Sequence, residues 1–191
     1  MLPDLRDEPG GTSFAGTFDA SASALNVTLR GGGQDMIFGG AGDDPFHSEG
    51  GNDLIDAGSR DSTVFPDGVP GSDTAAGSDG HDVLSLSGSG AGTGGFDILF
   101  CGDGAGTAPN ERTGQSAGVT GFEGIAGSAN ADVIGSGATT SGVTVRSGAG
   151  RGTITGGPGG DVLGGRSGGD RITGGAEADI FVVSPQTAAT R

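Results

Sequence analysis

The sequence lacks several residue types on which most folded domains depend. It has no tryptophan, tyrosine or lysine, and its 191 residues include a single cysteine, Cys101. A large aromatic core and an internal disulfide are therefore excluded. No long apolar run occurs, and the N-terminal residues lack a charged start followed by an apolar stretch. The sequence thus shows neither a membrane-spanning segment nor an N-terminal signal peptide.

Positive charge is also scarce. Nine arginines face 24 Asp and Glu residues, which gives a net charge of -15. This balance argues against nucleic acid and anionic membrane surfaces as partners and favours cations. We therefore expect no nucleic-acid binding and no membrane insertion.

Glycine is the residue present in excess, at 45 of 191 positions. This excludes an ordinary helical domain, and such a glycine-rich, acidic composition is typical of disordered chains. A regular repeat argues for an ordered fold instead.

The repeat is nine residues long. Residues 39–47 read G-G-A-G-D-D-P-F-H, with glycine at places 1, 2 and 4, aspartate at place 6 and an apolar residue at place 8. Flanking copies stand at 30–38, 48–56 and 57–65, four more run from 147 to 182, and isolated copies stand at 77–85, 92–100 and 127–135. Place 8 holds Ile, Leu, Val or Phe in all eleven copies, which low complexity alone does not explain.

Place 6 supplies the candidate metal ligands. They are Asp35, Asp44, Asp53, Asp82, Asp97, Asp132, Asp161, Asp170 and Asp179. Two copies depart from the pattern, because Ser62 and Gly152 stand where the aspartate belongs.

The pattern G-G-x-G-x-D-x-U-x resembles the repeats-in-toxin (RTX) family of hemolysin-type calcium-binding repeats. The resemblance covers about residues 30 to 182. It implies an all-β fold, a parallel β-roll (β-solenoid) of nine-residue half-coils, with several Ca²⁺ ions in the turns. It also implies secretion without an N-terminal signal peptide, by a type I system, to the cell surface or the extracellular space.

The spacing is consistent with that fold. Places 7 to 9 suffice for a short strand with place 8 pointing inward, and the glycine-rich remainder forms a turn that ends in a carboxylate. Two units make a coil of 18 residues, so we expect Asp35 to lie over Asp53 and Asp161 over Asp179. Asp44 should face Ser62, and Asp170 should face Gly152, giving weaker metal sites there. Because the place 8 core is thin, we expect calcium binding to supply folding free energy.

The copies divide the chain into five segments. We expect an N-terminal cap or extension at 1–24, a first β-roll block at 25–65, an irregular middle with isolated repeats and loops at 66–126, a second block at 127–182 and a C-terminal tail at 183–191. Within the middle, 66–80 and 101–121 are interpreted as loops that leave the roll.

Other candidate sites are weaker. The G-x-S-x-G motifs at 114–118 and 165–169 are explained by composition, both histidines precede them, and H-E-x-x-H is absent, so we expect no enzyme. His47 and His81 are interpreted as solvent-facing residues, with transition-metal ligation as the alternative. Cys101 is interpreted as a small buried residue or an intermolecular contact.

Three functions remain open. The first is a non-enzymatic extracellular structural module that stacks end to end with other copies of itself into fibres or a surface layer. The second is the calcium-binding folding and secretion tail of a larger RTX toxin, protease or lipase. The third is an adhesion module that binds through its loops.

Overall fold

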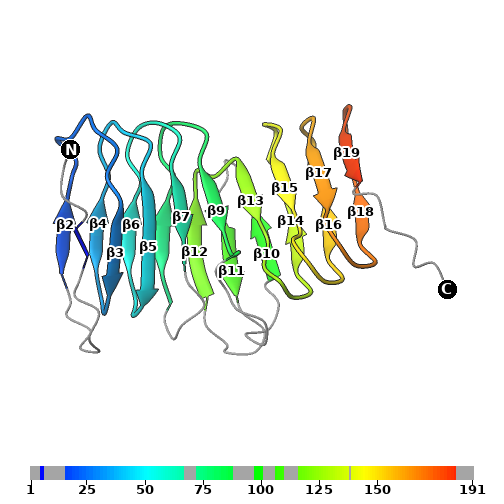
Figure 1. The fold of residues 1–191 in the computed structure, drawn as a ribbon. Helices are drawn as coiled ribbons and strands as arrows, with labels where there is room; N and C mark the ends of the chain where they lie inside the picture. Colours follow the sequence, from blue (N-terminus) through cyan, green and yellow to red (C-terminus); the bar gives the residue numbers. More distant parts are fainter. Residues whose placement is uncertain are drawn as a thin grey trace.

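The computed structural model describes residues 5–6, 16–66, 72–87, 97–100, 106–109, 116–137 and 139–183, with side chains within 16–66, 72–87, 118–137 and 139–183. These residues form two facing β-sheets that run the length of an elongated roll, with residues 17–19 at one end and 171–183 at the other (Figure 1). Short strands alternate between the sheets along most of the chain. The predicted all-β, parallel β-roll is confirmed. The described residues contain no helix of the length and hydrophobicity that a membrane crossing requires.

The first sheet consists of nine strands among the described residues. In spatial order they are β1 (Leu5–Arg6), β3 (Leu29–Gly32), β5 (Pro45–Gly50), β7 (Thr63–Phe65), β9 (Val83–Ser85), β13 (Gly124–Ala126), β15 (Thr144–Arg146), β17 (Val162–Gly165) and β19 (Ile180–Val183). All of these neighbours pair in parallel.

The second sheet has ten strands in the described part of the chain. Their spatial order is β2 (Thr17–Asp19), β4 (Met36–Phe38), β6 (Leu54–Asp56), β8 (Thr74–Ala76), β12 (Ser116–Thr120), β11 (Gly106–Pro109), β10 (Asp97–Phe100), β14 (Val133–Gly135), β16 (Thr153–Thr155) and β18 (Arg171–Thr173). Strand β11 pairs antiparallel with both β10 and β12, whereas the other pairs are parallel.

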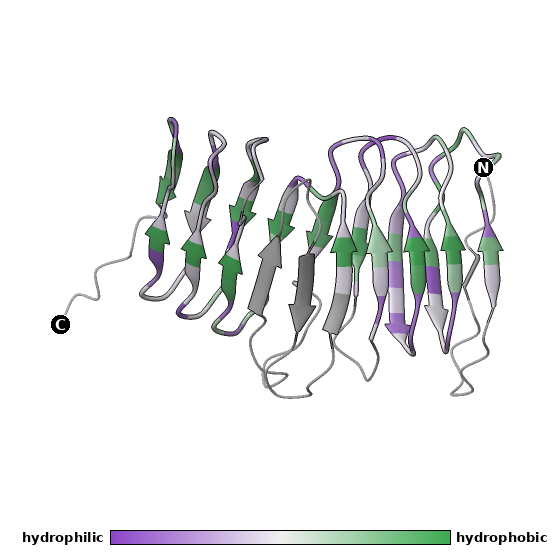
Figure 2. Ribbon diagram, turned by 180° about the vertical axis from the view of Figure 1, so that it is seen from behind, coloured by the Kyte–Doolittle hydropathy of each residue, from purple (hydrophilic) through white to green (hydrophobic). Residues whose placement is uncertain are grey.

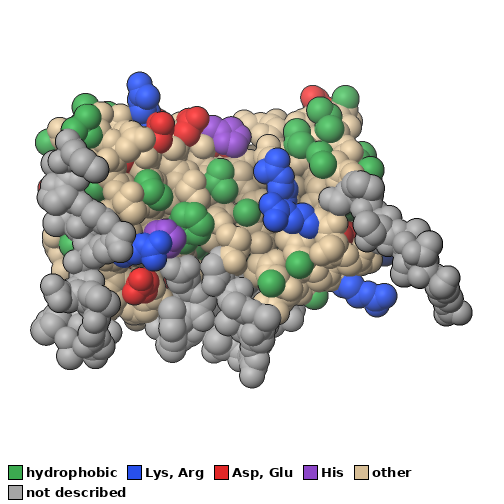
Figure 3. Space-filling view, viewed as in Figure 1, with side chains coloured by type: hydrophobic (Ala, Val, Ile, Leu, Met, Phe, Trp, Pro, Cys, Tyr) green, Lys and Arg blue, Asp and Glu red, His purple; other side chains and the backbone are tan. Residues whose placement is uncertain are grey.

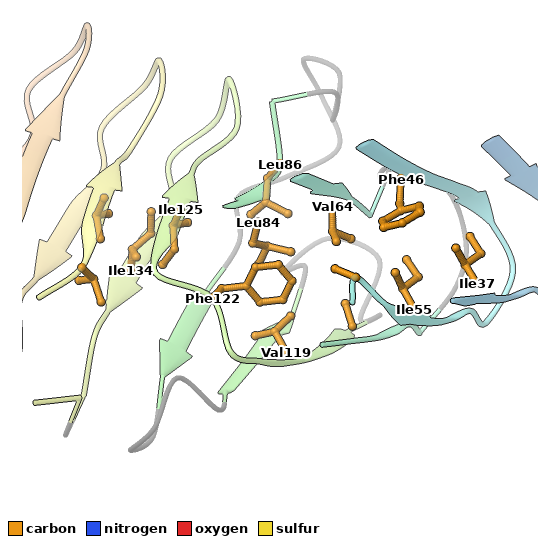
Figure 4. Close-up of a cluster of buried hydrophobic side chains, with 14 of the residues drawn as sticks. Ile37, Phe46, Ile55, Val64, Leu84, Leu86, Val119, Phe122, Ile125 and Ile134 are labelled. Carbon is orange, nitrogen blue, oxygen red and sulfur yellow. The ribbon is translucent and has the colours of Figure 1, made fainter. Parts of the chain in front are cut away.

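The core is a single file of apolar side chains between the sheets (Figure 4). The place 8 residues Ile37, Phe46, Ile55 and Val64 have no exposed surface. They alternate between the two sheets because successive strands do, and each points into the core because neighbouring side chains along a strand point to opposite faces. The hydropathy colouring shows the same pattern, with one apolar position in the middle of most strands (Figure 2). Phe181 lies in the last described strand and is half-exposed, since only β17 covers it.

The middle of the chain continues the roll where the sequence suggested loops. Within 66–80, β8 pairs with β6, and within 101–121, β11 and β12 lie in the second sheet. The copy at 92–100 is out of register by one residue, because Asp97 pairs with Val133 and Ile98 with Ile134. Ile98, and not Leu99, therefore occupies the strand position equivalent to place 8.

Candidate metal centre

The turns that connect the two sheets stack along the two long edges of the roll. Edge 1 consists of turns that lead into the first sheet, at 39–44, 57–62, 77–82, 156–161 and 174–179. Edge 2 consists of turns that lead into the second sheet, at 33–35, 51–53, 127–132, 147–152 and 166–170. Each turn ends two residues before a place 8 residue, and that residue is buried in all but the last two turns, where Ile172 is partly buried and Phe181 is half-exposed.

On edge 2, aspartates of successive coils form a hydrogen-bonded ladder. The backbone N–H of Asp35 donates to Oδ1 of Asp53 over 2.8 Å, and the N–H of Asp53 donates to Oδ1 of Asp73 over 3.0 Å. At the start of the ladder, the N–H of Gly16 donates to Oδ1 of Asp35. The predicted stacking of Asp35 on Asp53 is confirmed, and each carboxylate links its own coil to the preceding one.

Edge 1 carries the equivalent ladder. The N–H of Asp44 donates to the Ser62 hydroxyl over 3.1 Å, the N–H of Ser62 donates to Asp82 Oδ1 over 2.7 Å, and the N–H of Asp82 donates to Glu123 Oε2 over 2.9 Å. The expected pairing of Asp44 with Ser62 is therefore confirmed. In the second block the N–H of Asp161 donates to Asp179 Oδ1 over 2.9 Å.

The second oxygen of these carboxylates meets one of two environments. Oδ2 of Asp44, Asp132 and Asp161 accepts a backbone N–H from the start of its own turn. Oδ2 of Asp53 and of Asp82 is buried and has no hydrogen-bond partner among the described residues. A buried carboxylate oxygen without a donor is costly, and such an atom in a native fold indicates a missing ligand or proton.

The acidity of these two groups reflects the same environment. Burial raises the pKa of Asp53 to about 7, and the neighbouring Asp73 and Asp35 add to the shift, against an opposing hydrogen bond from the Asp35 backbone. Burial also raises the pKa of Asp82 to about 7, with a further contribution from Glu123 and an opposing hydrogen bond from the Ser62 backbone. Burial likewise raises the pKa of Asp73.

The surroundings of the carboxylates fit a hard cation. At the first glycine of three turns, an aspartate Oδ2 and a backbone carbonyl oxygen of the next coil both crowd the position that a Cβ would take. The three pairs of oxygens belong to Asp82 and Gly121, Asp132 and Ser147, and Asp161 and Gly174. No group of three or more His, Cys, Asp or Glu side chains gathers around one point among the described residues. The turns thus offer one carboxylate each together with carbonyl oxygens, the oxygen-only donor set that Ca²⁺ accepts.

The structure places most of the predicted ligands in the two ladders. Asp35, Asp44, Asp53, Asp82, Asp132 and Asp161 are buried at the ends of their turns, and Asp170 and Asp179 are half-buried. As expected, Asp170 faces Gly152, whose N–H donates to Asp170 Oδ1 over 2.9 Å. Asp97 belongs to β10, and its side chain lies outside the described residues.

Sequence reasoning missed two members of the ladders, Asp73 and Glu123. Asp73 follows Asp53 by 20 residues and precedes the buried Ala75, which is too small to count as a place 8 residue. Glu123 precedes the buried Ile125 by two residues, as an aspartate at place 6 would. Allowing alanine at place 8 and glutamate at place 6 would have found both.

The remaining candidates lie elsewhere on the roll. The His47 ring stacks on Phe65 with the ring centroids 4.3 Å apart, and His81 is exposed in an edge 1 turn. Of the two motif serines, Ser116 belongs to β12 and Ser167 to an exposed edge 2 turn. Cys101 falls outside the described residues.

Comparison with known proteins agrees with the repeat. The model of the RTX calcium-binding nonapeptide repeat (4 copies) matches residues 29–63, 67–89 and 146–182. The second match includes Asp73 and Asp82, so it extends the repeat through a segment that the sequence pattern left as a loop. No curated protein matches the chain.

Proposed function

Because this chain belongs to the family of RTX calcium-binding nonapeptide-repeat proteins, we propose that it is a non-enzymatic extracellular structural module that folds on calcium and stacks end to end with other copies of itself. The observation that carries the proposal is the pair of buried, unpartnered carboxylate oxygens of Asp53 and Asp82, one in each edge ladder. The aspartates of the nine-residue copies, together with Asp73 and Glu123, are the proposed ligands.

The ladders explain why folding depends on the ion. Each carboxylate accepts a backbone N–H from the preceding coil, so it holds two coils together through a hydrogen bond that also fixes it near its neighbours. Like charges in adjacent coils repel, and burial removes the water that would screen them. Bound Ca²⁺ supplies the opposing positive charge and takes oxygen ligands only. Extracellular modules of this kind bind with dissociation constants of about 10⁻⁴ to 10⁻³ M, so the cytosolic ion concentration leaves the chain unfolded and fit for export.

The C-terminal end of the described roll supports end-to-end stacking. The last strand, β19, exposes Ile180, Phe181, Val182 and Val183, and hydrophobic side chains gather over this end in the space-filling view (Figure 3). In the described residues β19 pairs only with β17, and β18 only with β16. An uncovered strand edge with apolar side chains is a template for another chain. A contact between unlike ends produces filaments when its rotation does not close into a ring, and stacking along the axis of a straight roll is of this open kind.

The experiment is electron microscopy and sedimentation of the protein with calcium added and then removed by EGTA, with circular dichroism on the same samples. We expect β-structure and filaments that appear with the ion and disappear with EGTA. The variant Phe181→Asp should fold but not form filaments. The matched control Val133→Asp adds the same charge on an exposed position of a sheet face, and it should form filaments as the wild type does.

Calcium-dependent folding and end-to-end stacking are tested separately. Equal dichroism with and without calcium would reject calcium-dependent folding. A folded monomer at all concentrations would reject stacking alone, and it would favour the folding and secretion tail of a larger protein.

A further inference from the structure

The exposed charge of the two blocks differs in sign. The first block, 25–65, has seven acidic residues and two arginines, whereas the second block, 127–182, has five acidic residues and four arginines. All four arginines of the second block are exposed, while Glu177 is its one exposed acid and stands on edge 1. In a chain with a net charge of -15, the surface of the second block is therefore locally positive.

Two of these arginines, Arg146 and Arg166, line the same hollow. Arg146 ends β15, where its strand neighbours are Ala126 and Gly164, so neither neighbour covers its side chain. Arg166 begins the next edge 2 turn, and both line a hollow of about 400 Å³ at this edge. The remaining lining residues are glycine, alanine and serine, and none is acidic. Figure 3 shows arginine side chains gathered over β15.

Neither guanidinium is neutralised within the described part of the chain. The ion pair formed there is Arg60 with Asp43, at 4.0 Å on the first block. The two turn carboxylates of the second block on this edge already have hydrogen-bond donors. Asp132 is buried and bonded to the N–H and hydroxyl of Ser128, and the half-buried Asp170 accepts from the N–H of Gly152 and the hydroxyl of Ser147. Ser87 and Ser167 also line the hollow, and the Ser87 hydroxyl shares a hydrogen bond of 2.8 Å with Ser85.

We infer that this hollow binds an oxyanion group, the sulphate, phosphate or carboxylate of a free ion or of an acidic polysaccharide. A guanidinium presents a planar fork of donors that matches two oxygens of such a group, and two guanidiniums on one hollow surround it. The ligand enters from the solvent at edge 2 and contacts Arg146, Arg166 and the serine hydroxyls. The hollow is lined by edge 2 turns and adjoins the candidate metal ligand Asp132, whereas it lies away from the strand edge proposed for stacking.

The test is isothermal titration of the full chain, folded in a few millimolar calcium. The probes are sodium sulphate, which stays soluble with calcium, and a short dextran sulphate, with neutral dextran as the blank. We expect saturable binding that falls at least about tenfold in the double variant Arg146→Ala/Arg166→Ala. Binding should persist in the control Arg30→Ala/Arg60→Ala, which removes the same charge from the first block. The variant Arg146→Lys/Arg166→Lys keeps the charge without the fork and should bind several-fold more weakly.

The two probes distinguish a free ion from an acidic polysaccharide as the source of the oxyanion group. Binding of both probes supports a site for the free group, and binding of dextran sulphate alone supports a site for the group on a polymer. Circular dichroism of each variant checks that the roll is intact. Absence of saturable binding to the wild type, or equal loss in the Arg30/Arg60 control, overturns the inference. An oligomer that dissociates in Arg146→Ala/Arg166→Ala without any probe also overturns it, because the occupant is then the acidic block of a second copy.

Discussion

The metal-free roll should lose stability as the pH rises from about 4 to 7. The carboxyl groups of Asp53 and Asp82 have a pKa of about 7 in the folded chain, against 3.8 for an ordinary aspartate. A group with a raised pKa in the folded state binds its proton more tightly there than in the unfolded chain. Its stabilisation is therefore complete below the unfolded pKa and is lost as the pH approaches the folded pKa. Neutral pH is where the roll needs a cation.

The magnitude is large for a domain of this size. A shift of about three units corresponds to about 4 kcal/mol for each carboxyl group, and to as much as about 8 kcal/mol for both. The whole folding free energy of a typical domain is about 5–15 kcal/mol. Ionisation of these two groups should thus remove a large share of the stability of a metal-free roll.

The assay is urea unfolding followed by circular dichroism, in EGTA, at pH 5 and at pH 8. We expect the wild type to be more ordered at pH 5. The variant Asp53→Asn/Asp82→Asn keeps an oxygen acceptor on each ladder but cannot ionise, so its stability in EGTA should change little between the two values. The control Asp43→Asn/Asp79→Asn removes two exposed charges and should retain the wild-type pH dependence. Equal stability of the wild type at pH 5 and pH 8, or a flat profile in that control, would refute the reasoning.

Three further substitutions test the turns and the core, each by urea unfolding or calcium titration in the presence of calcium. Gly156→Ala places a Cβ against the Gly174 carbonyl and the Asp161 carboxylate, and should lower the free energy of unfolding by about 1–3 kcal/mol. Leu163→Ala removes a fully buried place 8 side chain, and should cost about 2–5 kcal/mol. Ser62→Asp supplies the carboxylate missing from the edge 1 ladder, and isothermal titration should show one additional calcium ion bound.

Each of these three substitutions has a matched control or a stated contrary result. At Gly169 a Cβ meets only the Arg151 side chain, at 3.6 Å, so Gly169→Ala should be nearly neutral, and equal losses at Gly156 and Gly169 would argue against the crowded turn. Phe181→Ala should cost less than Leu163→Ala, since Phe181 is 50% exposed. An unchanged calcium stoichiometry in Ser62→Asp would argue against the ladders as ligands.

The nine-residue period predicted those parts of the fold in which one coil repeats the last. Ile37, Ile55 and Ile154 were recognisable as core because place 8 recurs with apolar residues, and Asp35 could be stacked on Asp53 by counting 18 residues. The role of each aspartate as a hydrogen-bond acceptor for the preceding coil was not predictable, because the pattern does not state which oxygen faces which donor.

The middle of the chain escaped prediction for a different reason. A repeat of half-coils encodes parallel stacking only, and the antiparallel pairs of β11 with β10 and β12 have no period. The segment 66–80 was interpreted as a loop, although β8 lies within it and pairs with β6 in the second sheet. The register of Asp97 was misassigned because an isolated copy has no adjoining copy to fix it.

The reversed strand β11 has a consequence for assembly of the molecule during folding. The chain passes from β9 to β10 beside β14, returns through β11 to β12 beside β8, and only then supplies β13. A coil-by-coil zipper that follows the chain therefore meets β10 and β11 before β12, although β12 is the strand that pairs with β8. Linear repeat proteins can nucleate anywhere and propagate, but from β10 to β12 the strands join the second sheet out of chain order. We expect the two halves to nucleate separately, so that truncating a core side chain in one half slows the closure of that half alone.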